Sequence, residues 1–371
     1  MNAKQPTTDR MMKAWRLEGL GGALTLEDVP VPEIRPGSVL LRIEASPLLS
    51  YLKDYVDGKL VFYNPPPGKF TLGTNGVGII EAIGRDVWHL RPGQRVVFSP
   101  HFISAENVTN PAQILIGLTA LGEGSAALQA DWRDGSLAEY SLAPVTTITP
   151  AERLDAITPT QLAVLNRFIV PFGGMLRGRL VTGEKLVVNG ASGAYGTAAV
   201  LLGIAMGAER VVAAGRNQAV LEAVARAGGT RVTPVRLTGN IAMDASAIRE
   251  AACGYLDMAF DIVGQANNAN ATLASLHSLK RAGRLVLMGS MTAPLPLSYS
   301  DMIRNDWEVI GQFMYPAGAY RRLMDLVRSG LLNIHAITPV AFALDALPKA
   351  MEAAATATNL ECVVVKSGGA G

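Results

Sequence analysis

The chain has 371 residues, more than twice the length of a typical domain, and 33 basic against 31 acidic side chains give a net charge of +2. Hydrophobic residues make up 49% and charged residues 17%, so the composition supports buried cores and excludes wholesale disorder. The charge balance does not favour nucleic acid, two cysteines cannot form a disulfide framework, and no apolar stretch can span a bilayer, so we expect a cytoplasmic protein without nucleic-acid or membrane partners.

The first 150 residues are rich in proline and contain short runs typical of strands. These apolar or alternating runs lie at residues 39–45, 77–83, 95–98 and 137–142. Turn signals separate them, and Arg-Pro-Gly occurs at both 35–37 and 91–93, where proline fixes φ and glycine permits the reversal. The pattern predicts an all-β, barrel-like domain.

From about residue 155, strand-like and helical stretches alternate. After a helical pattern at 160–176, apolar runs occur at residues 185–189, 210–214, 231–235, 256–263, 284–288 and 307–313. Helical stretches lie at residues 197–206, 218–227, 268–281, 320–329 and 346–357, and a final β-like run lies at 361–366. The alternation predicts βαβ units and the six-stranded parallel sheet of a doubly wound dinucleotide fold, so the fold class is α/β.

The most informative segment follows the strand at 185–189. Three glycines at three-residue spacing suit a tight exit from the strand, a close approach of a pyrophosphate and close packing of the next helix. The amide groups that open that helix, with the positive end of its dipole, would bind the phosphates. The expected cofactor-binding residues of this turn are Gly190, Ser192, Gly193, Ala194, Tyr195 and Gly196.

The end of the second strand predicts which dinucleotide binds. A site for NAD usually has an acidic residue here, whereas this chain has Gly215, Arg216 and Asn217. Without the carboxylate a 2′-phosphate is not repelled, and a guanidinium can bind that phosphate through two hydrogen bonds, so NADPH is favoured over NADH. The alternative is that Arg216 is a solvated residue at a helix start. Gly289 and Ser290, after the fifth strand, complete the expected cofactor site.

In order and spacing these motifs resemble the medium-chain dehydrogenase/reductase superfamily, which includes zinc alcohol dehydrogenases and zinc-free quinone and enoyl reductases. Besides the glycine turn, the resemblance rests on residues 12–14, 39–45, 72–78, 91–97, 135–140, 261–264 and 283–289. It implies a GroES-like β domain formed by residues 1–155 and 316–371, and a Rossmann domain formed by residues 156–315. It also implies a homodimer that forms through the strand at 307–313.

The chain departs from the zinc-dependent members of that superfamily. They have a His-Glu pair where this chain has Thr74-Asn75, and a cysteine at the position that aligns with Leu49. The segment 100–120, where a structural zinc would be held by cysteines, contains none. Because zinc requires thiolate, imidazole or carboxylate ligands, we expect no zinc and assign no metal ligand.

Without zinc, a ketone or enone needs another donor for the oxygen on which negative charge develops. By the resemblance, the loop at 46–55 faces the nicotinamide. The expected catalytic residue is Tyr51, then Tyr55 or Ser50, because a phenol has the reach and a pKa suited to proton donation. Zinc-free relatives often have an asparagine in place of the lost cysteine, and this chain lacks it.

The sequence therefore predicts a zinc-independent, NADPH-dependent oxidoreductase. It would transfer a hydride between the nicotinamide and a carbonyl (alcohol, ketone or aldehyde), or an enone or quinone. Aromatic and methionine residues after the strands, such as Phe98, Met288 and Phe313, favour a small apolar substrate if they line the pocket. The alternative is a protein that binds NADPH without turnover, as a structural protein or a redox sensor, because the zinc ligands and the asparagine are absent.

Overall fold

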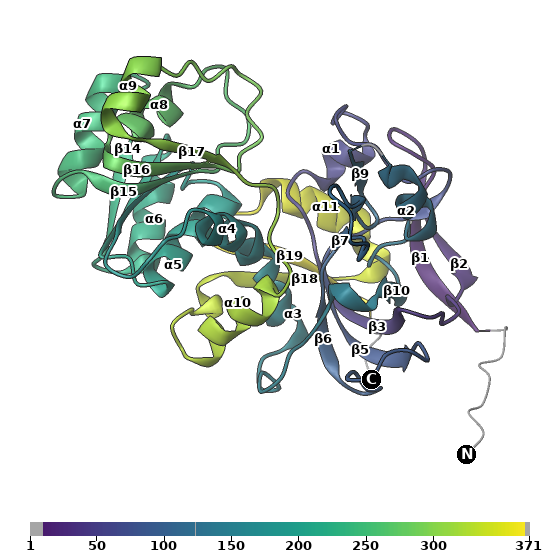
Figure 1. The fold of residues 1–371 in the computed structure, drawn as a ribbon. Coiled ribbons are helices and arrows are strands. Elements are labelled where there is room, and N and C mark those ends of the chain that lie inside the picture. Colours follow the sequence, from purple (N-terminus) through teal and green to yellow (C-terminus); the bar gives the residue numbers. More distant parts are fainter. Residues whose placement is uncertain (1–9, 123, 368–371) are drawn as a thin grey trace. The chain divides into compact units, whose positions relative to one another are not determined.

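The computed structural model describes residues 10–122 and 124–367. They form two compact units, which Figure 1 shows as ribbons coloured along the chain. The first unit contains Met1–Val164, Thr338–Ala357 and Glu361–Gly371, and the second contains Leu165–Ile337 and Thr358–Leu360. No helix of the described residues has the length and apolar character needed to cross a membrane.

The second unit is built on the six-stranded parallel sheet that the alternating pattern predicts. Its strands are β12 (Lys185–Asn189), β13 (Arg210–Gly215), β14 (Val232–Arg236), β15 (Leu256–Asp261), β16 (Leu279–Leu287) and β17 (Glu308–Gly311). They lie in the order β14-β13-β12-β15-β16-β17, and every neighbouring pair is parallel. The order reverses between β12 and β15, which is the position where doubly wound sheets bind dinucleotides, beyond the carboxyl ends of their strands.

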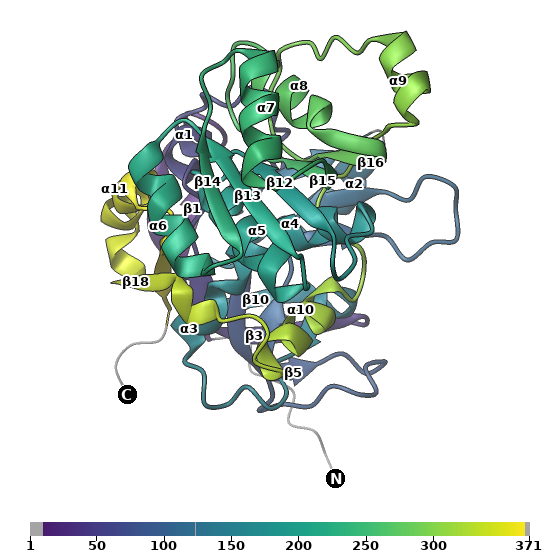
Figure 2. The same cartoon turned by 90° about the vertical axis from the view of Figure 1, so that its left-hand side faces the viewer.

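Helices cover both faces of this sheet (Figure 2). They are α4 (Leu165–Arg177), α5 (Ala194–Ala205), α6 (Gln218–Gly228), α7 (Ile241–Ala251), α8 (Asn270–His277), α9 (Tyr299–Asn305) and α10 (Ala319–Arg328), with a 3-10 turn at Ile334–Ala336. On one face α5 contacts α4 and α6, and on the other α7 contacts α8. The central strands β12, β13 and β15 are buried along most of their length, as expected for strands that are covered on both sides.

Several elements differ from the sequence prediction. The helix expected at 160–176 is interrupted at Val164, and β16 begins at Leu279, five residues before the predicted strand. Helices α7 and α9 were not predicted. In α7 the buried positions are only Asp244, Ala245 and Ile248, so its apolar pattern is weak, and the helix starts because the Asn240 side chain accepts a hydrogen bond from the Met243 amide.

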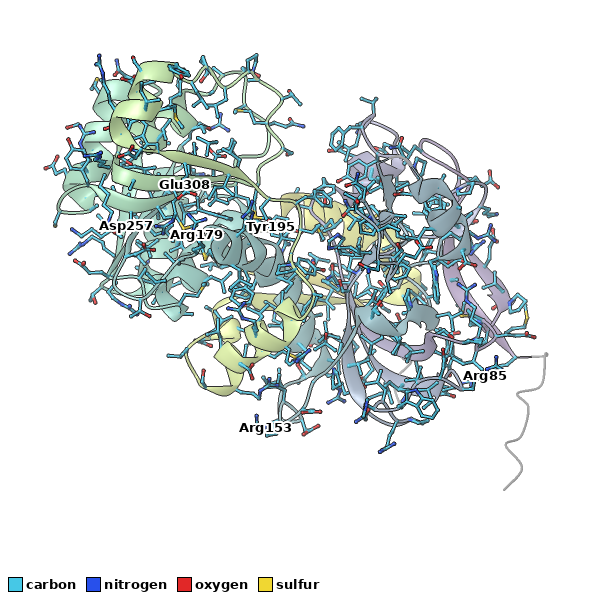
Figure 3. All side chains as sticks on the ribbon, in the orientation of Figure 1. Arg85, Arg153, Arg179, Tyr195, Asp257 and Glu308 are labelled. Atoms are coloured by element: carbon cyan, nitrogen blue, oxygen red, sulfur yellow. The ribbon has the colours of Figure 1, made fainter. Side chains whose placement is uncertain are left out.

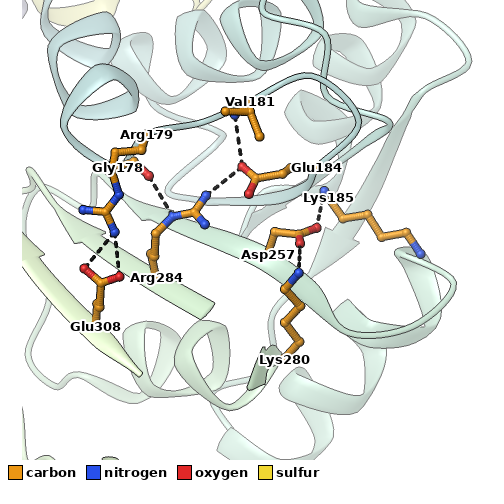
Figure 4. Close-up of polar contacts among 9 residues, drawn as sticks. All are labelled: Gly178, Arg179, Val181, Glu184, Lys185, Asp257, Lys280, Arg284 and Glu308. Carbon is orange, nitrogen blue, oxygen red and sulfur yellow. Dashed lines mark hydrogen bonds and ion pairs between the residues drawn. The ribbon is translucent and has the colours of Figure 1, made fainter. Parts of the chain in front are cut away.

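Ion pairs fix the amino-terminal edge of this sheet (Figure 4). Arg284 and Glu184 pair at 2.7 Å with both side chains mostly buried, and Arg179 donates to both carboxylate oxygens of Glu308 at 2.6 and 2.8 Å. Figure 3 labels Arg179 and Glu308 at this edge and Tyr195 at the start of α5, beyond the other edge. The pairs therefore stabilise the sheet and leave its carboxyl edge available for a ligand.

The described residues of the first unit form three sheets. The small ones have the orders β2-β1-β4 and β7-β8-β9, and the large one has the order β11-β6-β5-β3-β19-β18, with β10 paired to β3. The strands are β1 (Met11–Leu17), β2 (Leu24–Pro30), β3 (Ser38–Pro47), β4 (Phe70–Thr71), β5 (Gly76–Ile83), β6 (Arg95–Phe98), β7 (His101–Ile103), β8 (Gln113–Leu115), β9 (Thr119–Leu121), β10 (Tyr140–Pro144), β11 (Ile148–Pro150), β18 (Thr338–Ala343) and β19 (Glu361–Lys366). Its helices are α1 (Leu52–Val56), α2 (Ser125–Asp131), α3 (Pro159–Ala163) and α11 (Leu347–Thr356), with 3-10 turns at Val145–Thr147 and Leu344–Ala346.

Both ends of the chain contribute to the large sheet. The C-terminal strand β19 pairs antiparallel with β3 and parallel with β18, and the yellow strands of Figure 1 are these last two. The segment 316–337 differs from the expected division, because it belongs to the second unit, where α10 packs on α4. The residues that precede α10 also approach α4 closely, since a Cβ added to Gly173 would lie 2.2 Å from the Met314 carbonyl oxygen.

Candidate functional site

The turn between β12 and α5 is built from closely packed backbone. Gly190 has φ +87°, a conformation that side chains rarely adopt. A Cβ added to Gly196 would lie 2.0 Å from the Gly190 carbonyl oxygen, so α5 starts directly against the turn. A Cβ on Gly193 would meet only that same oxygen, at 3.3 Å, so this glycine otherwise borders open space that a ligand can approach.

The start of α5 presents a positive end to that space. Gly193 is the N-cap, and the Thr197 amide donates to its carbonyl oxygen at 2.8 Å. The amides of residues 194–196 precede the Thr197 amide in the first turn of the helix. Amides of a first turn point outward along the helix axis, here toward that space. The first turn contains no acidic residue, so the helix does not neutralise its own dipole. This geometry suits the diphosphate of a dinucleotide.

A residue from the C-terminal part of the chain holds the turn in place. The side-chain amide of Asn359, in the segment 358–360 that belongs to the second unit, donates to the Ser192 carbonyl oxygen. The two residues are 167 positions apart in the sequence, and no motif marks their contact. Asn359 was therefore missed in the sequence analysis.

A cavity of about 570 Å³ lies beside this turn, at the carboxyl ends of β13 and β14. It is lined by Ser192, Arg216, Asn217, Gln218, Ala219 and Arg236. The lining contains two guanidinium groups and no carboxylate. A Cβ on the neighbouring Gly215 would lie 3.0 Å from Ser192 Oγ, so even the first atom of a side chain is crowded there. Such a cavity can bind a phosphate group that carries two negative charges.

Three of the expected cofactor residues, Ser192, Arg216 and Asn217, line this cavity. Asn217 also caps α6, because its side-chain oxygen accepts a hydrogen bond from the Val220 amide at 3.3 Å. Arg236 was not predicted. Arg236 is the last residue of β14 and is paired with Gly215 in the parallel register. Because adjacent parallel strands end at the same edge of the sheet, its position at the end of the third predicted strand could have indicated it.

The turns after β15 and β16 also pack against each other. The Ser290 amide donates to the Val263 carbonyl oxygen at 3.0 Å, and a Cβ on Gly289 would lie 2.1 Å from that oxygen. Gly289 is thus required by packing between the two turns. Ser290 is exposed, so its side chain is accessible to a ligand.

A buried carboxyl group ties β12 to β15 at the reversal of strand order. Asp261 accepts hydrogen bonds from Asn189 Nδ2 at 2.7 Å and Thr272 Oγ1 at 2.6 Å. Burial raises the pKa of Asp261, and these two donors together with the Val263 amide partly offset that rise. The network fixes the strand ends from which the glycine turn starts.

The structure separates the three candidate catalytic residues, all of which lie in the first unit. Tyr55 is fully buried, its hydroxyl donates to the Leu118 carbonyl oxygen at 2.5 Å, and burial raises the pKa of Tyr55 far above its usual range. Tyr51 is half-buried and is hydrogen-bonded to Tyr63, whose ring centre is 6.3 Å away. Ser50 is exposed. The Tyr55 hydroxyl is therefore used in a hydrogen bond within the core, whereas the side chains of Tyr51 and Ser50 are accessible to a ligand.

The positions that would hold zinc contain no suitable ligand. Thr74, Asn75 and Leu49 are all buried, and none carries a thiolate, imidazole or carboxylate. The Asn75 carbonyl oxygen accepts a hydrogen bond from Ser136 Oγ at 2.9 Å, which belongs to the packing of the loop. Across residues 10–122 and 124–367, no group of three or more His, Cys, Asp or Glu is placed to hold a metal ion. The residues present do not fit a catalytic zinc.

Two protein families match the chain, and together they cover more than half of it. The alcohol dehydrogenase GroES-like domain matches residues 35–153, and the zinc-binding dehydrogenase family matches residues 194–329. The matches confirm the predicted fold class, a GroES-like β domain with a Rossmann sheet.

Full-length relatives are similar at low identity. An NAD-dependent alcohol dehydrogenase from Sulfurisphaera tokodaii is 27% identical over 86% of this chain and 90% of its own length. An L-threonine 3-dehydrogenase from Anaeromyxobacter dehalogenans is 27% identical over 90% of this chain and 92% of its own. Among solved structures, a zinc-binding dehydrogenase from Sinorhizobium meliloti bound to NADP aligns with a TM-score of 0.74 at 23% identity, over 96% of this chain and 100% of its own.

Proposed function

Because the chain belongs to the medium-chain, alcohol dehydrogenase-like superfamily and is an NAD(P)-dependent oxidoreductase, we propose that it uses NADPH, without zinc, to reduce a carbonyl compound, an enone or a quinone. The observation that carries the cofactor assignment is the cavity beside the glycine turn, where Arg216 and Arg236 face the same space without a carboxylate. A carboxylate there would bind the ribose of NADH and repel a 2′-phosphate.

Each group that is proposed to act in the reaction has a separate task. The bound coenzyme supplies the hydride. The amides that open α5 hold its diphosphate, and the two arginines bind its 2′-phosphate. Tyr51 donates a proton or a hydrogen bond to the substrate oxygen, and Tyr63, bonded to Tyr51, orients that hydroxyl. Gly193 lets the coenzyme approach the backbone.

A direct assay tests the proposal. We expect stereospecific oxidation of NADPH with at least one class among ketones, aldehydes, enones and quinones, and slower oxidation of NADH. Because the relatives include alcohol and sorbitol dehydrogenases, secondary alcohols and polyols should be assayed with NADP in the reverse direction. A preference for NADH, or binding of NADPH without oxidation in any assay, would contradict the proposal.

Metal analysis tests the zinc-free assignment. We expect purified protein to contain far less than one zinc ion per chain, and its activity to survive dialysis against a chelator, because the buried positions 49, 74 and 75 offer no ligand. Stoichiometric zinc, or activity that a chelator removes and zinc restores, would refute it.

Removal of the Tyr51 hydroxyl should separate chemistry from coenzyme binding. We expect Tyr51→Phe to lower kcat by about 10²- to 10⁴-fold, the usual contribution of a proton donor, with the Kd for NADPH unchanged. Tyr55→Phe is the matched control. It removes a hydrogen bond to Leu118 from the core, so we expect a loss of stability of about 1 kcal/mol and nearly unchanged kcat. Equal kcat in the wild type and Tyr51→Phe would exclude Tyr51.

We further propose a homodimer formed through β17. This strand is at one edge of the six-stranded sheet, with β16 on its other side, and a second copy could continue the sheet there. Size-exclusion chromatography with light scattering should give twice the mass of the chain. A monomer at micromolar concentration would be the contrary result.

A further inference from the structure

Helix α4 carries a large, almost completely buried cation. Arg167 is 1% exposed, and its Nε has no hydrogen-bond partner. No carboxylate of the described residues forms an ion pair with its guanidinium. The preceding residue, Asn166, is 2% exposed, and its Nδ2 also has no partner. Two adjacent residues thus hold buried donors that the described chain does not use.

The packing of α4 shows where these donors lie within the second unit. A Cβ on Gly178 would lie 2.5 Å from the Met258 side chain. A Cβ on Gly174 would lie 2.5 Å from the Phe260 side chain, nearer the carboxyl end of the same strand, β15. The helix therefore runs antiparallel to β15. Arg167 is seven residues before Gly174, so it is on the same face and about 10 Å farther along the axis.

This position is beyond the carboxyl end of β15. Helical side chains lean toward the N-terminus of their helix, which carries the guanidinium of Arg167 still farther past the strand end. Ligands of doubly wound sheets bind on that side. The Arg167 guanidinium is consequently at the edge of the sheet that the proposed coenzyme occupies. The first turn of α4 contains no acidic residue that could pair with it.

A buried guanidinium needs an anion. A buried charge without a counter-ion is strongly unfavourable. The phosphates of the proposed coenzyme do not supply that anion, because they are assigned to the start of α5 and to the cavity at β13 and β14. The ligand that remains is the substrate.

We propose that Arg167 binds a carboxylate group of the substrate. The planar guanidinium matches the two oxygens of a carboxylate. The natural substrate is then a carbonyl or unsaturated compound that also carries a carboxylate, which is more polar than the apolar substrate expected from the sequence. The assignment rests on the proposed function for the identity of the reaction and for the placement of the coenzyme phosphates.

Calorimetric titration with butyrate and butyramide tests this site, because the two probes share their shape and differ in charge. We expect wild-type protein, with and without NADP, to bind butyrate at least tenfold more tightly than butyramide. Arg167→Met should lower the butyrate affinity at least tenfold and leave the butyramide affinity unchanged. Arg167→Lys should retain part of the preference. Arg226→Met, which removes an exposed arginine of α6, is the matched control and should match the wild type.

The melting temperature is a second readout. If Arg167 had only a structural role, its replacement would lower the Tm of the unliganded protein. Without ligand, Arg167→Met should melt no lower than the wild type, because it removes an uncompensated charge. Butyrate should raise the Tm of the wild type and of Arg226→Met, but not that of Arg167→Met. A lower Tm for unliganded Arg167→Met, equal affinity for the two probes, or unchanged butyrate binding in the variant would each overturn the proposal. Butyrate selectivity without NADPH binding would instead remove the coenzyme assignment and leave the carboxylate site.

Discussion

Replacement of both Arg216 and Arg236 by alanine should raise the Kd for NADPH by about 10²- to 10⁴-fold. Both side chains line the cavity beside the glycine turn. A hydrogen bond to a charged group contributes about 1.5–3 kcal/mol, so two lost phosphate contacts amount to about 3–6 kcal/mol. The Kd for NADH should change by less than about threefold, because NADH has no 2′-phosphate. Fluorescence titration of the bound nicotinamide measures both constants.

The single variants and a control locate the effect. Arg216→Ala and Arg236→Ala should each give a smaller loss for NADPH, and Arg226→Met, an exposed arginine of α6 outside the cavity, should give none. An equal loss for NADPH and NADH in the double variant would show that the arginines act on the fold or on the diphosphate. In that case the assignment of the 2′-phosphate to this cavity would be wrong.

The coenzyme turn could be predicted from the sequence because its requirements are local. Gly190 is required by its positive φ, Gly196 by its close approach to the Gly190 carbonyl oxygen, and Gly193 only by the proposed ligand, and all three are visible within seven residues of the sequence. The positions of Arg236 and Asn359 in the site depend on contacts between distant parts of the chain. Arg236 reaches the cavity through the order and register of the strands, and Asn359 through a contact across 167 positions. Such long-range placements are not encoded in any short pattern.

The candidate catalytic residues show a different limit. The loop that contains Tyr51 and Tyr55 was identified by resemblance, but the two phenols are chemically alike in the sequence. Burial and the hydrogen bond to Leu118 distinguish them, and both depend on the fold of the whole unit. Arg167 was missed for a related reason, because a cation within a helical pattern is usually solvated. Its burial is evident only from the packed helix.

Substitution of Gly196 by alanine should abolish coenzyme binding and also destabilise the protein. The added Cβ would lie 2.0 Å from the carbonyl oxygen of Gly190 and 2.7 Å from its carbonyl carbon. Both are backbone atoms of a turn with positive φ, so α5 must shift away. Overpacking of this kind costs about 1–3 kcal/mol of stability. The shift also displaces the amides that are proposed to hold the diphosphate, so we expect the Kd for NADPH to rise at least about 100-fold.

The matched variant Gly193→Ala should affect binding without affecting stability. Its Cβ would meet only the Gly190 oxygen, at 3.3 Å, and its backbone, at φ −88° and ψ 164°, is one that alanine adopts readily. The unliganded Tm should therefore stay the same or rise slightly, because alanine restricts the unfolded chain. The new methyl group projects into the space proposed for the pyrophosphate, so the affinity for NADPH should fall about tenfold or more. The described residues leave room for a Cβ at position 193, so only a bound ligand would require glycine there. If Gly193→Ala bound NADPH as tightly as the wild type, the diphosphate would not lie against this turn.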